Sequence, residues 1–330
     1  MAKGNNQKLK LLYLAKILLE ETDDEHGISM PGIISRLAEA DISADRKTLY
    51  SDIEELRKFG IDVIGEQREK SFLYYVGSRD FELPELKLLV DSVQAAKFIT
   101  EKKSHALIKK LEKLASTYEA KQLQRQVLIS GRVKTMNESI YYNVDKIHTA
   151  INANSQIRFQ YFQWNVEKEQ ELRHDGEWYH VSPWYLIWDD EYYYLVAYDD
   201  RSKILKHYRL DKMLRITLTG KEREGKELLS NSDVAAYSKS LFGMFGGDKV
   251  AVTLEAENRF AGILIDRFGK EIFITKVDDG HFRTAVDVVP SELFISWIMS
   301  FGDGIRIVAP DSVVESVKQL LSTLGKTYLG

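Results

Sequence analysis

Apolar residues recur at helical spacing through the first part of the chain. Three segments place leucine, isoleucine or alanine three and four residues apart, as amphipathic helices do: 8–22, 30–40 and 42–60. In the first of them, the expected buried face comprises Leu11, Leu12, Ala15, Leu18 and Leu19. Ser29 is suited to cap the second helix, and Pro31 is suited to its first turn. Two shorter runs rich in β-branched and aromatic residues follow and predict a β-hairpin: 61–64 and 72–76.

The third helical segment carries two different faces. Leu49, Ile53 and Leu56 form a stripe at i, i+4 and i+7 that we expect to be buried. Basic and hydrogen-bonding side chains fill the rest of its first two turns: Arg46, Lys47, Thr48, Tyr50 and Ser51. Such side chains at a helix N-terminus can reach base edges in the major groove, and the hairpin tip adds Arg68 and Lys70. We therefore expect residues 1–78 to form a winged helix-turn-helix domain that binds double-stranded DNA. The alternative is a helical bundle with a surface hairpin.

The charge of this segment does not by itself favour DNA. Acidic residues outnumber basic ones over residues 1–77, whereas a domain that binds phosphates is usually basic. The acids concentrate in a loop at 20–25, which we expect to face away from the DNA. Weak non-specific binding and a dependence on dimerisation should follow.

Residues 79–140 return to helical spacing. Pro84 stands at the start of one expected helix, and a second helix is predicted over 104–120. The apolar stripes fit a helical linker that pairs two protomers into a homodimer. A strong excess of Lys and Arg over 97–134 fits either a solvated helix face or contact with nucleic acid.

Short strands dominate residues 141–229. After a helix at 144–152, runs of aromatic and β-branched residues predict strands at 157–163, 169–172, 178–181, 184–188, 192–198, 204–210 and 215–219. This spacing predicts a small barrel or sandwich. Asp-Asp pairs between some of these runs are expected in turns, where aspartate bonds the local backbone.

Composition excludes several classes of function. The 330-residue chain has no cysteine, which excludes disulfides and cysteine nucleophiles. The N-terminus lacks the apolar core of a signal peptide, and no apolar run approaches the ~20 residues of a membrane helix. The glycine-rich stretch 243–249 lacks the ending of a phosphate-binding loop. With no metal motif, cofactor motif or catalytic constellation in the sequence, we expect a cytoplasmic binding protein that is not an enzyme.

Residues 180–213 resemble the signature of WYL-domain transcriptional regulators. The family's Trp-Tyr-Leu tripeptide aligns with Tyr193-Tyr194-Leu195, and its Phe-Arg-Leu-Asp-Arg-Ile motif aligns with Tyr208-Arg209-Leu210-Asp211-Lys212-Met213. The literal Trp184-Tyr185-Leu186 lies one strand earlier, and we interpret it as a coincidence. Three positions depart from the pattern: Tyr193 replaces Trp, Tyr208 replaces Phe and Lys212 replaces Arg. The last change removes the planar fork of arginine from the motif.

The resemblance implies an SH3/Sm-like β-barrel that binds an effector, such as single-stranded DNA. Nine side chains are suited to phosphate or base contacts: Arg158, Tyr161, His180, Ser182, Trp184, Tyr193, His207, Arg209 and Lys212. The donors would bind phosphate, and the aromatic rings would stack on bases. Alternatively the aromatic residues fill the barrel, as we expect of Trp188 and Tyr194, and the two histidines have structural roles.

Residues 230–330 begin with an expected linker at 230–248 and continue with the order βαββαβ and a closing helix. This order is typical of a ferredoxin-like domain and resembles the C-terminal extension that follows WYL domains. The whole sequence therefore predicts an α+β multidomain, homodimeric transcriptional regulator that binds an operator under the control of an effector. The alternative is a transcription factor that senses a small-molecule metabolite through the WYL or the ferredoxin-like domain.

Overall fold

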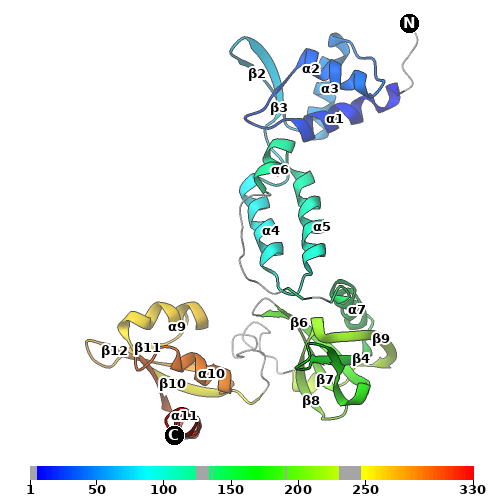
Figure 1. Cartoon of the computed structure of the whole chain (residues 1–330). Coiled ribbons are helices and arrows are strands. Elements are labelled where there is room, and N and C mark those ends of the chain that lie inside the picture. Colours follow the sequence, from blue (N-terminus) through cyan, green and yellow to red (C-terminus); the bar gives the residue numbers. More distant parts are fainter. Residues whose placement is uncertain (1–5, 124–133, 136, 190–191, 230–246) are drawn as a thin grey trace. The chain divides into compact units, whose positions relative to one another are not determined.

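The structure is a computed structural model that describes residues 6–123, 134–135, 137–189, 192–229 and 247–330 (Figure 1). The chain divides into two compact units, Met1–Glu138 and Ser139–Gly330. In the described ranges, no helix is both long enough and apolar enough to cross a lipid bilayer.

Three helices and a three-stranded sheet begin the first unit (Figure 1). The helices are α1 (Lys10–Glu21), α2 (Met30–Glu39) and α3 (Arg46–Phe59). The strands are β1 (Ile28–Ser29), β2 (Val63–Arg68) and β3 (Ser71–Val76), paired antiparallel in the order β1-β3-β2. The predicted helices and hairpin are present, and the sheet gains one short strand that the sequence pattern did not predict.

Capping residues fix the ends of α2 and α3. The Ser29 hydroxyl accepts a hydrogen bond from an amide in the first turn of α2, as predicted. The Asp45 carboxylate caps α3 by accepting from the Lys47 and Thr48 amides, both at 3.0 Å. Gly60 ends α3 with φ at 109°, a left-handed conformation that favours glycine. These caps set the point on the surface at which α3 begins.

The core of this part lies between the three helices and β3. Its fully buried members include Leu14, Leu18, Ile33, Leu37, Leu49 and Ile53. The predicted buried face of α1 is wrong for three of its five residues, because Leu12 is 67% exposed and Leu11 and Leu19 are also exposed. Apolar residues surround α1 on most sides, so their spacing alone does not select the buried face.

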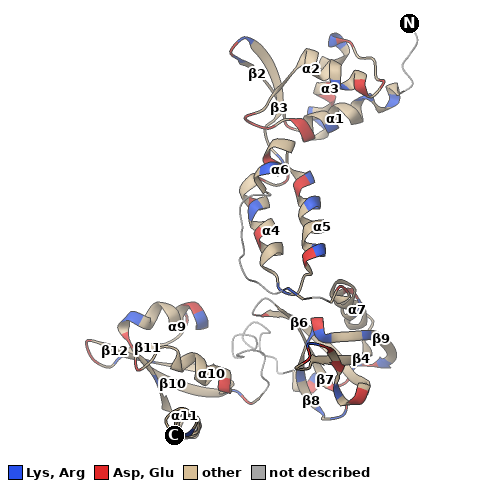
Figure 2. Ribbon diagram, in the orientation of Figure 1, with Lys and Arg blue, Asp and Glu red and all other residues tan. Residues whose placement is uncertain are grey.

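A helical segment follows, with α4 (Leu83–Ala95), α5 (Glu101–Leu111), η2 (Glu112–Leu114) and α6 (Thr117–Leu123). The predicted single helix over 104–120 is wrong, because the chain becomes extended at Ala115 and restarts at Ser116. The Ser116 hydroxyl accepts from the Glu119 amide at 3.0 Å, which starts α6. Figure 2 shows acidic as well as basic residues along α4 and α5. Part of the predicted basic stretch, 124–133, lies outside the described residues.

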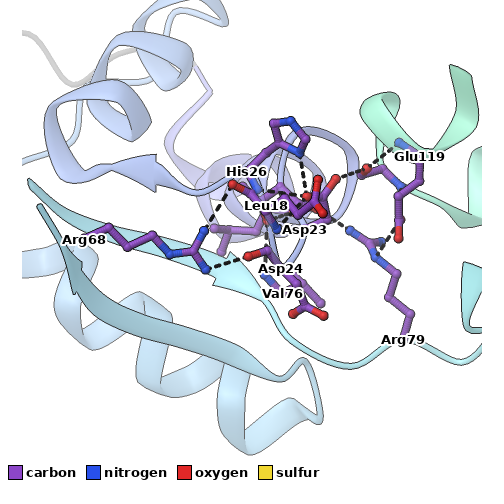
Figure 3. Close-up of polar contacts among 11 residues, drawn as sticks. Leu18, Asp23, Asp24, His26, Arg68, Val76, Arg79 and Glu119 are labelled. Atoms are coloured by element: carbon purple, nitrogen blue, oxygen red, sulfur yellow. Dashed lines mark hydrogen bonds and ion pairs between the residues drawn. The ribbon is translucent and has the colours of Figure 1, made fainter. Parts of the chain in front are cut away.

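The loop between α1 and β1 is bound to α6 (Figure 3). Asp23 in this loop is 6% exposed, and its carboxylate accepts a hydrogen bond from Ser116 Oγ at 2.5 Å. His26 Nδ1 lies 2.7 Å from the same carboxylate, and the His26 ring stacks on Tyr118 with centroids 3.8 Å apart. Asp23 therefore has a structural role within the acidic loop 20–25, because its carboxylate is enclosed by these partners.

Two arginines hold the same loop from opposite directions (Figure 3). Arg79, which precedes α4, donates to the Thr22 carbonyl at 2.6 Å and lies 3.9 Å from the Glu119 carboxylate. Arg68 reaches the loop from β2 and donates to two of its carbonyl oxygens at 2.6 and 3.1 Å. The loop therefore connects the hairpin to the helical segment.

The second unit begins with α7 (Ile140–Asn152) and six strands. The strands are β4 (Ser155–Trp164), β5 (Gln170–Leu172), β6 (Tyr179–Asp189), β7 (Tyr192–Asp199), β8 (Ile204–Arg209) and β9 (Met213–Glu222). They pair in the order β5-β4-β6-β7-β8, and β9 also pairs with β4, so the sheet closes into a half-barrel. The strands predicted at 178–181 and 184–188 are one strand, β6, whose register shifts between Pro183 and Tyr185.

The C-terminal part of this unit has the element order that the sequence predicts. Its elements are β10 (Val250–Glu257), α9 (Ala261–Phe268), β11 (Ile274–Lys276), β12 (His281–Val288), α10 (Glu292–Met299), β13 (Ile305–Ala309) and α11 (Asp311–Tyr328). The four strands are antiparallel in the order β11-β12-β10-β13. Phe294, Leu254 and Leu264 are fully buried in its core. Most of the predicted linker and glycine-rich stretch, 230–246, lies outside the described residues.

Candidate nucleic-acid interfaces

The first candidate interface is the N-terminal half of α3. Leu49, Ile53 and Leu56 are buried, so the opposite side of the helix faces solvent. All five predicted DNA contacts on α3 are exposed: Arg46, Lys47, Thr48, Tyr50 and Ser51. These side chains therefore form one accessible surface at the start of the helix.

Three of these side chains also have local structural contacts. Arg46 Nε donates to the Tyr50 hydroxyl at 2.8 Å, which pairs the two side chains along the helix. The Thr48 hydroxyl lies 3.0 Å from a carboxylate oxygen of Asp45, so it takes part in the cap. Lys47 and Ser51 complete the surface.

The hairpin contributes less than predicted. Arg68 does not extend from the tip, because its guanidinium is bound to the carbonyl oxygens of Asp24 and Glu25 and stacks 4.5 Å from the Tyr75 ring centroid. Arg68 also pairs with Glu66 of its own strand, so it holds the hairpin to the loop. Lys70 is exposed in the turn at the tip.

The second candidate interface surrounds Arg209 at the end of β8. Arg209 Nε and Nη2 donate to the two carboxylate oxygens of Asp211 at 3.1 and 2.8 Å. The guanidinium lies 3.6 Å from the centroid of the Tyr192 ring, and the Arg209 amide donates to the Tyr161 hydroxyl at 3.1 Å. A guanidinium held on one edge and on one face is pre-oriented for a planar, bidentate contact.

Charge and burial shape this site further. Burial raises the pKa of Tyr161 to about 12, so its hydroxyl keeps its proton at neutral pH. Burial, followed by the nearby charge of Arg209, lowers the pKa of Lys212. Arg173 of the 3-10 segment η3 (Arg173–Gly176) adds a third positive charge that acts on both Tyr161 and Lys212. The structure thus brings together three predicted residues, Tyr161, Arg209 and Lys212.

Two other predicted residues form a separate cluster on the barrel. Arg158 lies opposite His180 in the register of β4 and β6, and both are exposed. The Arg158 guanidinium lies 4.8 Å from the Trp178 ring centroid. This cluster is a second place where a cation and an aromatic ring meet, without the carboxylate clamp of Arg209.

Ser182 and Trp184 have structural contacts instead. Ser182 is completely buried, and its hydroxyl accepts from the Glu224 amide at 2.8 Å, so the structure gives it a structural role in place of the surface position that the prediction requires. Trp184 Nε1 donates to the Glu224 carbonyl at 3.1 Å, and its ring packs on Arg223. Both residues join β6 to the segment after β9.

His207 and Tyr193 do not share the environment of Arg209. Burial lowers the pKa of His207 to about 4, so this histidine is neutral at pH 7 and adds no charge for a phosphate. Arg209 pairs with Tyr194 in the register of β7 and β8, so Tyr193 lies on the opposite face of the sheet. Tyr193 instead neighbours Trp188, which is 51% exposed, contrary to the prediction that Trp188 fills the barrel.

Three residues of the Arg209 site escaped the sequence analysis as ligand contacts: Asp211, Tyr192 and Arg173. Asp211 was inside the aligned motif, and a carboxylate two residues from an arginine signals a clamp. Tyr192 stands next to the aligned tripeptide, but nothing in its local sequence distinguishes it from Tyr193. Arg173 gave no signal, because a 3-10 segment with two left-handed residues positions it. In the described part of the chain, no group of three or more His, Asp or Glu side chains is arranged to hold a metal ion.

Two family models match this chain, and both fall in the second unit. Residues 142–218, which include Arg209, match the WYL domain, and residues 248–325 match the WCX domain. The second unit therefore contains a WYL domain followed by a WCX domain, which confirms the resemblance for this part of the sequence.

One similar solved structure is "Proteasome accessory factor B/C (PafBC) of Arthrobacter aurescens". It is 17% identical, with a TM-score of 0.27, over 95% of this chain and 46% of that chain. The present chain therefore spans about half the length of that structure. No curated protein matches the sequence.

Proposed function

We propose that this protein is a DNA-binding transcriptional regulator whose WYL domain binds a nucleic-acid effector that modulates operator binding. The observation that carries the proposal is the Arg209 guanidinium, clamped by Asp211 and stacked on Tyr192 within the matched WYL segment. Such an arginine is suited to phosphate, and single-stranded DNA supplies both phosphates and bases. The proposed activity is binding rather than catalysis, and its place is the cytoplasm.

The N-terminal part supports the DNA-binding half of the proposal. Three helices followed by a hairpin are the elements of a winged helix-turn-helix, with α3 as the recognition helix. Its cap and buried stripe present Arg46, Lys47, Tyr50 and Ser51 on one surface. Because helix-turn-helix proteins commonly bind paired half-sites as dimers, we propose that the protein acts as a homodimer on its operator.

The two β-rich parts support the predicted domain types. In the barrel, β4 pairs with β6 and β9, and a 3-10 segment, η4 (Leu210–Lys212), joins β8 to β9, which favours a small SH3/Sm-like barrel. In the C-terminal part, the βαββαβ order with the sheet order β11-β12-β10-β13 favours a ferredoxin-like domain.

The DNA-binding half is tested by Arg46→Ala together with Lys47→Ala. Affinity for duplex DNA is measured by fluorescence anisotropy between 50 and 200 mM salt, about the range over which phosphate contacts weaken strongly. Loss of two phosphate contacts should reduce the slope of log K against log salt by about 2. The control, Lys276→Ala with Lys318→Ala, removes the same charge from exposed positions in the second unit and should leave the slope unchanged. An unchanged slope in the α3 variant would refute the assignment of α3.

The effector half is tested by Arg209→Gln. Arg209→Glu would place a second negative charge beside Asp211, which is 6% exposed, and would destabilise the barrel. The neutral Arg209→Gln is therefore the better variant. Binding of a labelled single-stranded oligonucleotide should fall by about tenfold or more, as expected when a charged hydrogen-bond donor to phosphate is lost. Arg259→Gln, at an exposed arginine in the C-terminal part that also lies against an aromatic ring, is the matched control and should bind normally. Equal oligonucleotide binding by the wild type and Arg209→Gln would refute the site. A melting curve of the wild type tests the alternative function: a rise in melting temperature with small metabolites but not with oligonucleotides would favour the metabolite sensor.

A further inference from the structure

Three cationic side chains from three different elements act on one another electrostatically, and two of them, Arg209 and Arg173, also act on Tyr161. Arg209 ends β8, Lys212 lies in η4 and Arg173 lies in η3. Both 3-10 segments pack against β4, the strand that carries Tyr161. The barrel topology, rather than closeness in sequence, therefore assembles this group of charges.

The positive charges in this group exceed the negative ones. Asp211 is the carboxylate that faces it, and both of its oxygens already bind Arg209. In the part of the chain that the structure describes, the charges that act on Lys212 are those of Arg209, Asp211 and Arg173. One carboxylate against three cations leaves the group with an excess of two positive charges.

The site also keeps donors for a tetrahedral ligand. Asp211 uses the Nε–Nη2 edge of Arg209, and the Tyr192 ring covers one face of the guanidinium. The Nη1 side of Arg209 has no hydrogen-bond partner among the described residues, so it is available to a ligand oxygen. The Tyr161 oxygen accepts from the Arg209 amide, which leaves the phenolic proton for a ligand as well. A phosphate group has enough oxygens to accept from all these donors.

We infer that this site takes a doubly charged phosphate monoester, the terminal phosphate of an oligonucleotide, in preference to the singly charged phosphodiesters of its backbone. A phosphate monoester carries between one and two negative charges at pH 7, close to two above its second pKa of about 6. A doubly charged monoester would neutralise both excess positive charges of the group, whereas a phosphodiester, with one negative charge, would neutralise only one of them. The inference rests on the proposed function, because it takes the Arg209 site as the effector site.

The test compares three oligonucleotides of one sequence with the full-length chain: 5′-phosphorylated, 3′-phosphorylated and unphosphorylated. Anisotropy titrations at pH 7.5 should show one phosphorylated form binding about tenfold more tightly than the unphosphorylated form. Equal affinity for all three, still dependent on Arg209, would overturn this inference and leave the proposed function intact. Failure of every oligonucleotide to bind would instead overturn the proposed function.

A second test changes the excess charge of the site and keeps the Arg209–Asp211 pair. Lys212→Gln removes one cation and leaves the Arg209–Asp211 pair in place, so the preference for the phosphorylated form should fall by about fivefold or more. Lys221→Gln, at an exposed lysine on β9, is the matched control and should keep the preference. A melting curve for each variant checks that the barrel is folded. If folded Lys212→Gln keeps the full preference, the excess charge has no role. Competition with inorganic phosphate is a further measurement. If inorganic phosphate competes as strongly as the phosphorylated oligonucleotide does, the ligand is not the terminus of an oligonucleotide.

Discussion

Replacing Asp23 tests whether the loop after α1 joins the hairpin to the helical segment. The Asp23 carboxylate accepts from Ser116 Oγ at 2.5 Å, and it also accepts from the amides of Glu25 and His26 at 3.0 and 2.9 Å. In Asp23→Ala these donors lose their acceptor in a site where the residue is 6% exposed. Ser116 is completely buried, so water cannot easily replace the Asp23 carboxylate as the acceptor for its hydroxyl.

The expected cost follows from these contacts. A hydrogen bond to a charged group contributes about 1.5–3 kcal/mol, and a buried donor left without a partner costs about as much. The amides of Glu25 and His26 border solvent more closely, so we assign most of the effect to Ser116. We expect Asp23→Ala to lower the local stability of the junction by about 2–3 kcal/mol, and Ser116→Ala to lower it by less, because that variant leaves the carboxylate its other donors.

Hydrogen exchange on the full-length chain measures this effect where it should occur. A loss of 2 kcal/mol raises the population of the open state about 30-fold, so protection of the α6 amides should fall by that factor. Amides of α9 and α10 in the second unit provide the internal control and should keep their protection. The double variant Asp23→Ala with Ser116→Ala should cost less than the sum of the two single changes. Unchanged protection in α6, or strictly additive effects, would refute the reasoning.

Two further predictions concern the barrel. Gly225→Ala should lower the melting temperature sharply, because φ is +80° and the new Cβ would overlap the Tyr198 side chain. Gly220→Ala is the control: φ is +75°, but the space around it is open, so this variant should cost only the backbone strain of about 1–2 kcal/mol. Equal melting temperatures for the two variants would contradict this. Asp199 is buried, but hydrogen bonds from Tyr208, Ser202 and Lys206 outweigh its burial and lower its pKa to about 2. Its contribution to stability is therefore complete above about pH 4 and should be lost as the pH falls toward 2; Asp199→Asn should flatten this part of the stability curve, and an identical pH dependence would contradict the assignment.

The surface of α3 was predictable because local rules decide it. The stripe of Leu49, Ile53 and Leu56 fixes which side of the helix is buried, so the exposed positions follow from the helical repeat. The same rule failed for α1, where Leu12 is exposed, because apolar residues on most sides leave the choice to tertiary packing. It also missed the role of Asp23, whose main partner lies 93 positions away in sequence.

The barrel site was predictable only where a motif covered it. The aligned motif pointed to Arg209, and it also contained the clamp of this arginine, Asp211. The contacts of Ser182 and Trp184 were not predictable, because one bulged strand, β6, replaces the two predicted strands and these side chains bind the segment after β9. Arg173 reaches the site through the shape of a 3-10 segment, which residue spacing does not encode.

The central claim is that one protein binds duplex DNA through α3 and responds to an effector at Arg209. The most direct measurement is the affinity of the full-length chain for a duplex that it selects from genomic fragments, with and without a saturating phosphorylated oligonucleotide. We predict that the oligonucleotide changes the duplex affinity of the wild type and leaves that of Arg209→Gln unchanged. The account is contradicted if the wild type does not respond, or if Arg209→Gln responds as the wild type does.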